Sequence, residues 1–348
     1  AVILLLIALI MFVVYFFMDK KLDSQTHAEE EKDDPFRLSD LKKILTSQGF
    51  WIVALLCVLY YSAIFPFQKY AVNMLQCNLT LSEPAADSFW ASNQVTIIQY
   101  VIMLVVAATA FAGNFCKGRN NKIVLFGLSG IALVTYCYFG YMRQSAEAIF
   151  AVFPLLAVGI TPILGSYVDH KGKAASMLVF GSLLLILCHL TFAFVLPACK
   201  GYDGAGVAVA YITILVLGAS FSLVPASLWP SVPKLVDSKI IGSAYALIFW
   251  IQNIGLWLFP LLIGKILTAT NSELAAQVAS HKITEEVAAV SYDYKWPLLM
   301  LAFLGLAALF LGLYLKVLDR KKHLHLEDPN ICAEEIPADE AEMADAEA

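Results

Sequence analysis

Charge is scarce in this sequence. Only 15% of its 348 residues are charged, and 60% are hydrophobic, whereas a soluble domain carries about 25% charged residues. The mean hydropathy is +0.73. A soluble protein could not bury that much apolar surface, so the composition predicts a polytopic membrane protein.

Signatures of a catalytic or cofactor site are also missing. The seven cysteines stand singly, without a Cys-x-x-Cys pair or a Cys/His cluster, so neither a metal site nor a disulfide framework is indicated. No nucleophile elbow or pair of catalytic acids is found. We therefore expect no enzyme, no cofactor and no nucleic-acid partner. Cys77 and Cys199 both fall on the predicted non-cytoplasmic side, where a disulfide stays an alternative to free thiols.

Long apolar runs dominate what is present. Nine segments are long enough, or nearly so, to cross a bilayer: 1–17, 50–70, 95–113, 123–141, 148–167, 174–197, 205–230, 241–267 and 296–317. Placing 18–49 in the cytoplasm puts all but six of the 23 lysine and arginine residues on that side. The positive-inside rule requires this asymmetry. The exceptions are Lys69, Arg143, Lys200, Lys265, Lys282 and Lys295.

The polar segments have distinct patterns. Residues 18–49 form a predicted cytoplasmic linker, in which apolar residues from Leu38 to Leu45 recur at helical spacing. This spacing favours a short amphipathic helix on the membrane surface, with a frayed linker as the alternative. Residues 318–348 form a predicted disordered cytoplasmic tail, because 327–348 holds nine acids and no base. The first run, 1–17, lacks a starting methionine and is typical of a truncated helix in a fragment.

A charged hinge, Gly165-Ser-Tyr-Val-Asp169-His-Lys171-Gly172-Lys173, separates two apolar runs. Gly165 would let a neighbouring helix approach closely. Asp169 is placed to pair with a basic side chain or with the positive N-terminus of another helix. Lys171 and Lys173 would hold the loop in the cytoplasm, and Gly172 permits a tight reversal.

Some residues within the spans need polar or special surroundings. Tyr60 and Tyr61 precede Pro66, which frees a backbone carbonyl that neighbours or a cavity must satisfy. This favours a place on a cavity wall for both tyrosines, with an interfacial belt of aromatic residues as the alternative. His189 is either a proton-coupling group or, more ordinarily, a histidine bonded to a helix carbonyl.

Another set of polar residues lies in the span 241–267. Tyr245 precedes Gln252 by two helical turns, and Asn253 follows directly. An unpaired amide in hydrocarbon would cost several kcal/mol, about 1–8 depending on the reference state. These side chains therefore need either a partner helix or a watery cavity, and both alternatives remain open.

The hinge resembles the short cytoplasmic loop motif of the major facilitator superfamily, Gly-x-x-x-Asp-(Arg/Lys)-x-Gly-(Arg/Lys). It matches at Gly165, Asp169, Gly172 and Lys173, and His170 departs from the usual basic residue. The order of spans is also similar, once the pair at 95–141 is set aside. Further motifs resemble a subfamily of lysosomal dipeptide transporters and its bacterial relatives: Tyr60-Tyr61, Phe65-Pro66-Phe67, Leu228-Trp229-Pro230, Gly242-x-Ala244-Tyr245 and Ile251-Gln252-Asn253-Ile254-Gly255.

The resemblance implies an all-α helix bundle. Residues 50–317 would form the C-terminal six-helix lobe with the inserted pair 95–141, and 1–17 would be the last helix of the N-terminal lobe. In this superfamily a solute binds between two lobes that rock to expose it alternately. The implied cavity wall comprises Tyr60, Tyr61, Trp229, Tyr245, Gln252 and Asn253, and Asp169 would latch against a helix of the first lobe.

The implied function is that of a secondary active or facilitative transporter of a small organic solute, with dipeptides among the candidates. Its partners would be the lipid bilayer, the solute and an N-terminal lobe, without which the chain would not transport. A bacterial inner membrane or a eukaryotic lysosomal or plasma membrane would house it. The alternative is a non-transporting scaffold or sensor of similar fold.

Overall fold

The computed structural model describes residues 2–25, 38–82, 84–116 and 118–330. Regular structure over these residues is helical, without strands. Eight of the described helices are long and apolar enough to cross a membrane, and they coincide with the spans predicted from 50–70 onward. The prediction of an all-α polytopic bundle is confirmed.

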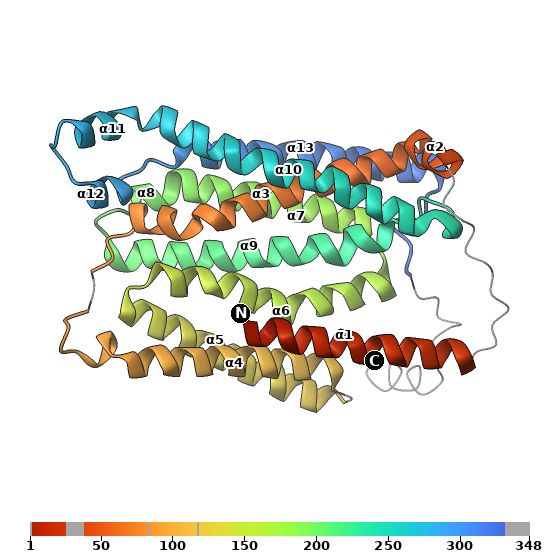
Figure 1. Cartoon of the computed structure of the whole chain (residues 1–348), viewed down its shortest axis with the longest axis horizontal. Coiled ribbons are helices and arrows are strands. Elements are labelled where there is room, and N and C mark those ends of the chain that lie inside the picture. The colour runs from red at the N-terminus through yellow and green to blue at the C-terminus, as the bar shows by residue number, and fades with distance from the viewer. Residues whose placement is uncertain (1, 26–37, 83, 117, 331–348) are drawn as a thin grey trace.

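Six long helices make up the main bundle, and Figure 1 shows them side by side. They are α3 (Gln48–Asn78), α6 (Ala146–Lys171), α7 (Ala174–Leu190), α9 (Asp203–Ser231), α10 (Ile241–Thr270) and α13 (Lys295–Lys322). Helix α9 packs against α6 and α7, whereas α3 packs against α10 and α13, and α13 also contacts α7. Helix α3 is the most enclosed of these helices. In its 18-residue apolar stretch 67% of the residues are buried, against 22% in that of α10.

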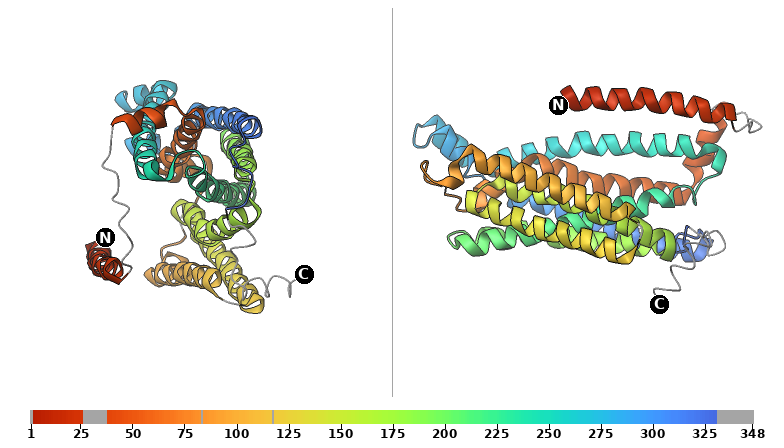
Figure 2. Two further views of the ribbon diagram at one scale, coloured as in Figure 1. Left: turned by 90° about the vertical axis from the view of Figure 1, so that its right-hand side faces the viewer. Right: turned by 90° about the horizontal axis from the view of Figure 1, so that it is seen from below.

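Two further spans, α4 (Asn93–Phe115) and α5 (Arg119–Arg143), form the pair predicted at 95–141. They pack against each other and against α6, at one edge of the bundle (Figures 1 and 2). The absence of a side chain at Gly113 lets the Phe126 ring approach, and Ser129 Oγ donates to the Val106 carbonyl over 3.1 Å. Only 22% of the residues in the 18-residue apolar stretch of α4, and 17% in that of α5, are buried. The pair therefore lies at the periphery of the bundle.

The N-terminal segments differ from their predicted bounds. Helix α1 (Val2–Gln25) continues beyond residue 17, and its described side chains between Leu5 and Lys21 are exposed. Figure 2 shows α1 apart from the bundle. Helix α2 (Leu38–Thr46) is the short helix expected before the second span, with Ile44 buried. The intervening part of the linker, 26–37, lies outside the described residues.

Short helices complete the connections. Helix α7 runs through a π-helical turn, η2 (Thr191–Val195), into α8 (Leu196–Ala198). Pro197 lacks the N–H that would bond the Ala193 carbonyl, which explains the wider turn. The remaining short elements are η1 (Phe89–Ala91), η3 (Ser238–Ile240), α11 (Ser272–Ala279) and α12 (Glu285–Ala289).

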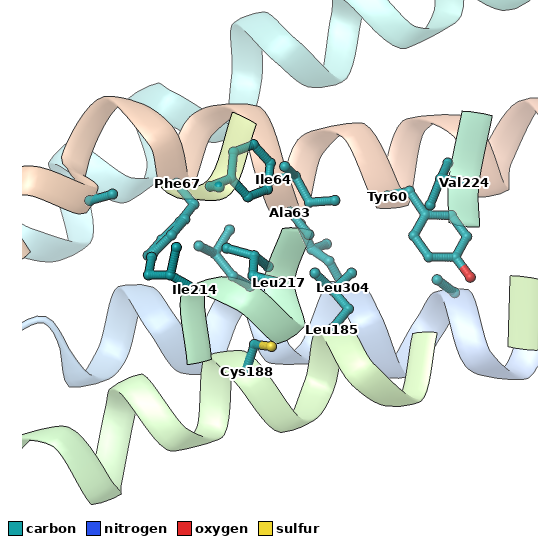
Figure 3. Close-up of a cluster of buried hydrophobic side chains, with 14 of the residues drawn as sticks. Tyr60, Ala63, Ile64, Phe67, Leu185, Cys188, Ile214, Leu217, Val224 and Leu304 are labelled. Carbon is teal, nitrogen blue, oxygen red and sulfur yellow. The ribbon is translucent and has the colours of Figure 1, made fainter. Parts of the chain in front are cut away.

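The core lies between α3, α7, α9 and α13, where Phe67, Leu185, Leu217 and Leu304 come together (Figure 3). His189 is also fully buried there, and its Nδ1 lies 2.9 Å from the Leu185 carbonyl. The more ordinary of the two predictions for this histidine is confirmed. Cys77 and Cys199 are free thiols.

Candidate functional site

Tyr60 and Tyr61 are consecutive on α3 and face different surroundings. Tyr60 is completely buried; its hydroxyl donates to the Leu178 carbonyl and lies 2.6 Å from Ser182 Oγ, both on α7. Since successive residues are turned by about 100° around a helix, Tyr61 points to another side. Tyr60 therefore belongs to the core, and the cavity position predicted for it is not observed.

Six aromatic side chains from three helices form a continuous surface, which we call the aromatic wall: Tyr61, Phe65, Phe221, Trp229, Tyr245 and Phe249. None of them is fully buried. Such ring pairs contribute about 0.5–1.5 kcal/mol each beyond the area they bury. The wall thus joins α3, α9 and α10 and leaves each of the six side chains at least partly exposed.

Hydrogen bonds fix the rings of the wall. The indole Nε1 of Trp229 donates to the Tyr61 hydroxyl over 3.1 Å, and the Tyr245 hydroxyl donates to the Trp229 carbonyl over 3.0 Å. The Trp229 ring stacks on Phe249 with centroids 4.8 Å apart. Three of the predicted site residues, Tyr61, Trp229 and Tyr245, are therefore brought together.

Asn253 lies on the same face of α10. Tyr245, Phe249, Asn253, Leu256 and Pro260 follow one another at intervals of three or four residues, which places them on one side of a helix. The Asn253 side chain is exposed, and its Nδ2 donates to the Phe249 carbonyl over 2.7 Å.

Gln252 is turned away from this face. Its side chain is 6% exposed, and its Oε1 accepts a hydrogen bond of 3.2 Å from Cys57 Sγ on α3. Nearly one turn on, Gly255 leaves room for Ser62 of α3. Of the two alternatives for Gln252, the structure has interhelical bonding, so Gln252 holds α10 to α3 and does not line the wall.

A cavity of about 460 Å³ adjoins the wall between α3, α6 and α10. Its lining residues are Phe65, Pro66, Gln68, Lys69, Phe150, Leu256 and Pro260. Among the described residues that line it, Lys69 alone is charged. Sequence reasoning counted Lys69 only as a basic residue of the non-cytoplasmic side. The sequence did contain a signal for a site here, because Lys69 lies one helical turn after Phe65 and close to Pro66.

A larger cavity of about 740 Å³ lies at the opposite end from the hinge, beside the ends of α3 and α5. Its charged groups are mostly engaged within the chain, since Arg143 donates to Gln99 Oε1 over 2.6 Å and Lys200 to the Cys77 carbonyl over 3.1 Å. It lies apart from the wall. Over the described ranges no group of three or more His, Cys, Asp or Glu side chains could hold a metal ion.

The charged hinge joins α6 to α7. Gly172 has φ +73° and ψ −139°, and a Cβ atom there would lie 2.7 Å from the carbonyl carbon of Asp328. Gly165, by contrast, has open space around it. The Lys171 and Lys173 side chains are exposed. Asp169 is partly buried, and its Oδ1 accepts a hydrogen bond of 2.7 Å from Asn330 Nδ2.

Residues 323–330, which we call the C-terminal clasp, return over the hinge. The Glu327 carboxylate accepts from Ser176 N over 2.7 Å and from Ser176 Oγ over 2.8 Å, in the first turn of α7. Leu326 is fully buried, and its N–H donates to Asp319 Oδ1 over 3.0 Å.

Lys234, just after α9, also holds the clasp by donating to the His325 and Asp328 carbonyls over 2.9 and 2.7 Å. Burial lowers the pKa of Lys234, although Asp328 acts in the opposite sense. The predicted disordered tail thus begins with ordered chain: α13 continues to Lys322 and the clasp follows. Residues 331–348 lie outside the described part of the chain.

Comparison with curated proteins finds lysosomal dipeptide transporters named MFSD1. The protein of Danio rerio is 24% identical over 265 residues, which cover 75% of this chain and 41% of the relative. The Homo sapiens protein is 23% identical over 254 residues, 72% of this chain and 38% of the relative. The Mus musculus protein is 28% identical over 148 residues, 42% of this chain and 29% of the relative.

The chain spans less than half the length of these relatives. Their names describe transporters and not enzymes. The sequence matches no family model and no solved structure. The matches confirm the resemblance to transporters of the major facilitator superfamily, and together with the eight spans they establish a multi-pass integral membrane protein.

Proposed function

We propose that this chain, a multi-pass membrane protein of the major facilitator kind, forms the C-terminal lobe of a secondary active or facilitative transporter. The observation that carries the proposal is the aromatic wall of partly exposed side chains, with an adjoining cavity of about 460 Å³. A small organic solute would bind against this wall and be exposed alternately to the two sides of the membrane. Dipeptides are candidates because the relatives are named as dipeptide transporters.

The proposed solute contacts are Tyr61, Trp229, Tyr245 and Asn253, joined by the phenylalanines of the wall. The phenol and amide groups can exchange hydrogen bonds with a peptide-like solute, while the ring faces accept its apolar side chains. Tyr60 and Gln252 contribute indirectly, because they hold α3 against α7 and α10.

An N-terminal lobe would face the wall and the hinge. Two features support this part of the proposal: the exposed side chains of α1 and the open space around Gly165. In the complete protein, helix α1 would pack within that lobe, and Asp169 would meet the N-terminus of one of its helices. The hinge residues Gly165, Asp169, Lys171, Gly172 and Lys173 would then form the cytoplasmic gate. The 348-residue chain alone would not transport.

Uptake by reconstituted protein tests this function. The complete polypeptide that carries this chain is placed in liposomes, and uptake of labelled dipeptides and a wider solute panel is measured with and without a pH gradient. Trp229→Ala should lower uptake at least about tenfold, equivalent to about 1.4 kcal/mol. Trp296→Ala is the matched control, because Trp296 is 57% exposed on α13, which contributes no residue to the wall, and it should transport normally.

The scaffold or sensor alternative has one supporting observation, the clasp that ties the charged hinge to the C-terminal segment. It predicts that no solute of the panel moves while a soluble protein co-purifies through the C-terminal tail. That combined result would replace the transport proposal.

A further inference from the structure

Lys69 is a cation on the wall of the 460 Å³ cavity, whose other described lining residues are uncharged. It lies nine residues before the end of α3, about 14 Å along the helix axis, so it falls within the spanning segment. Its side chain is exposed. The lining around it is mostly hydrophobic: Phe65, Pro66, Phe150, Leu256 and Pro260.

The charge of Lys69 has no counterpart in this part of the protein. No hydrogen bond or ion pair joins Lys69 to another residue within 2–25, 38–82, 84–116 or 118–330, and α3 itself contains no acid. An unbalanced charge within a membrane span is costly, and such residues typically mark a ligand path or pair with another group. The position therefore needs an anionic group to balance it.

Gln68 supplies a second polar group at the same cavity. Its amide and the Lys69 ammonium together offer several N–H donors on one side. One ammonium carries a single positive charge, which balances one carboxylate, whereas a phosphate monoester carries a charge of about −1.5 to −2 at pH 7. With a single cation and an apolar lining, the cavity fits one carboxylate with an apolar group attached to it.

We infer that Lys69 binds the carboxylate of the transported solute, and that Phe65, Phe150, Leu256 and Pro260 hold the apolar group next to that carboxylate. This inference rests on the proposed transport function and assigns the charge of the solute to a residue. It selects solutes that end in a free carboxylate beside an apolar side chain, and disfavours the corresponding amides.

Transport of a matched pair of solutes tests the assignment. The complete protein in neutral phosphatidylcholine liposomes is given Ala-Phe, labelled, or its C-terminal amide. The expected result is that Lys69→Gln lowers uptake of Ala-Phe at least tenfold and leaves uptake of the amide unchanged. Lys69→Arg should restore part of the preference for the carboxylate.

Lys265 provides a matched control. It is an exposed lysine of α10 in the same half of the membrane, and lies about 160° around the helix from the face that carries Phe249 and Pro260. Lys265→Gln should change the uptake of neither solute. If Lys69→Gln lowers uptake of Ala-Phe and of its amide equally, or lowers neither, the assignment is overturned. The proposed transport function would still stand.

Two further arms distinguish a lipid anchor from a solute site, and failed transport from failed binding. If the effect of Lys69→Gln appears only in liposomes with anionic lipid and is the same for both solutes, Lys69 anchors a lipid headgroup and the inference fails. If the wild-type protein moves no solute, the proposed function fails, and a binding measurement then tests the assignment of Lys69 separately. The carboxylate site is upheld if Ala-Phe stabilises the detergent-solubilised wild-type protein against heat but does not stabilise Lys69→Gln. Equal stabilisation of the wild-type protein and Lys69→Gln would reject it.

Discussion

Phe65 and Phe67 stand two residues apart on α3 and are chemically identical, yet they belong to different regions of the molecule. Phe67 is 2% exposed and stacks on Phe192 with ring centroids 5.3 Å apart, inside the core. Phe65 is partly buried on the wall, where it stacks on Tyr61 at 5.4 Å. The pair shows that one helix carries both a packing face and an open face.

The same contrast recurs on α10, where Gln252 is buried against α3 and Asn253 is exposed beside Phe249. Both regions are apolar and aromatic, so their difference lies in which side chains have protein on every side. Stability should depend on the packed face and solute handling on the open face. The first prediction tests that division, and two others extend the comparison to the hinge and the clasp.

The largest expected effect concerns the two phenylalanines. Phe67→Ala should lower the free energy of unfolding by about 3–5 kcal/mol, because it leaves a cavity in a packed core. Phe65→Ala should cost less, about 1–2 kcal/mol, because its ring is partly exposed and loses two ring contacts but leaves no enclosed cavity, and it should reduce solute uptake. Thermal unfolding of the purified protein in detergent measures the first effect. Equal destabilisation by both variants would remove the distinction between the faces.

A smaller effect is expected from the two glycines of the hinge. Gly172→Ala should destabilise by about 1–3 kcal/mol, because residue 172 has positive φ and its Cβ would meet the clasp backbone. Gly165→Ala should be neutral or slightly stabilising in the 348-residue chain, because nothing lies within 4 Å of its Cβ and alanine favours a helix.

The two hinge glycines also sharpen the comparison of regions. In the complete protein, a bulky residue at Gly165 should slow transport if another lobe approaches there, even though it leaves the stability of this chain unchanged. Transport unaffected by Gly165→Leu would argue against close approach of the other lobe at this position.

The smallest effect is expected at the clasp. Glu327→Ala should cost about 1 kcal/mol, because the carboxylate caps the first turn of α7 through Ser176. Hydrogen exchange of the Ser176 amide should accelerate. Asp328→Ala is the comparison variant, because its carboxylate bonds His325 within the clasp over 2.7 Å, whereas the Glu327 carboxylate bonds α7; it should change the exchange of the Ser176 amide less. Unchanged exchange in Glu327→Ala would show that the clasp does not hold this helix end.

Much of the fold could be predicted from the sequence. Hydropathy located the spans from 50–70 to 296–317, because a spanning segment must be long and apolar whatever surrounds it. The glycine-rich hinge was also found, because Gly172 needs a conformation that other residues rarely adopt. Helix α3 nevertheless extends to Asn78, beyond the predicted end at residue 70, since its polar continuation is supported by packing.

The site was predicted less completely. Tyr61, Trp229 and Tyr245 do come together, but Tyr60 and Gln252 lie in interhelical contacts, and Lys69, Phe65, Phe221 and Phe249 were not recognised. The clasp was missed as well. Its sequence is polar and acidic, and it folds only because Lys234, Ser176 and Asp319 offer partners from three distant segments.

The sequence by itself determined where the eight spans of the described chain lie and where each one turns. Tertiary structure decided which side of each helix is enclosed. The physical reason is that lipid tails are as apolar as a protein core, so hydrophobicity marks the depth of a residue in the membrane but not its direction. Tyr60 and Tyr61 have the same chemistry and nearly the same depth, and only the position of α7 makes one of them part of the core.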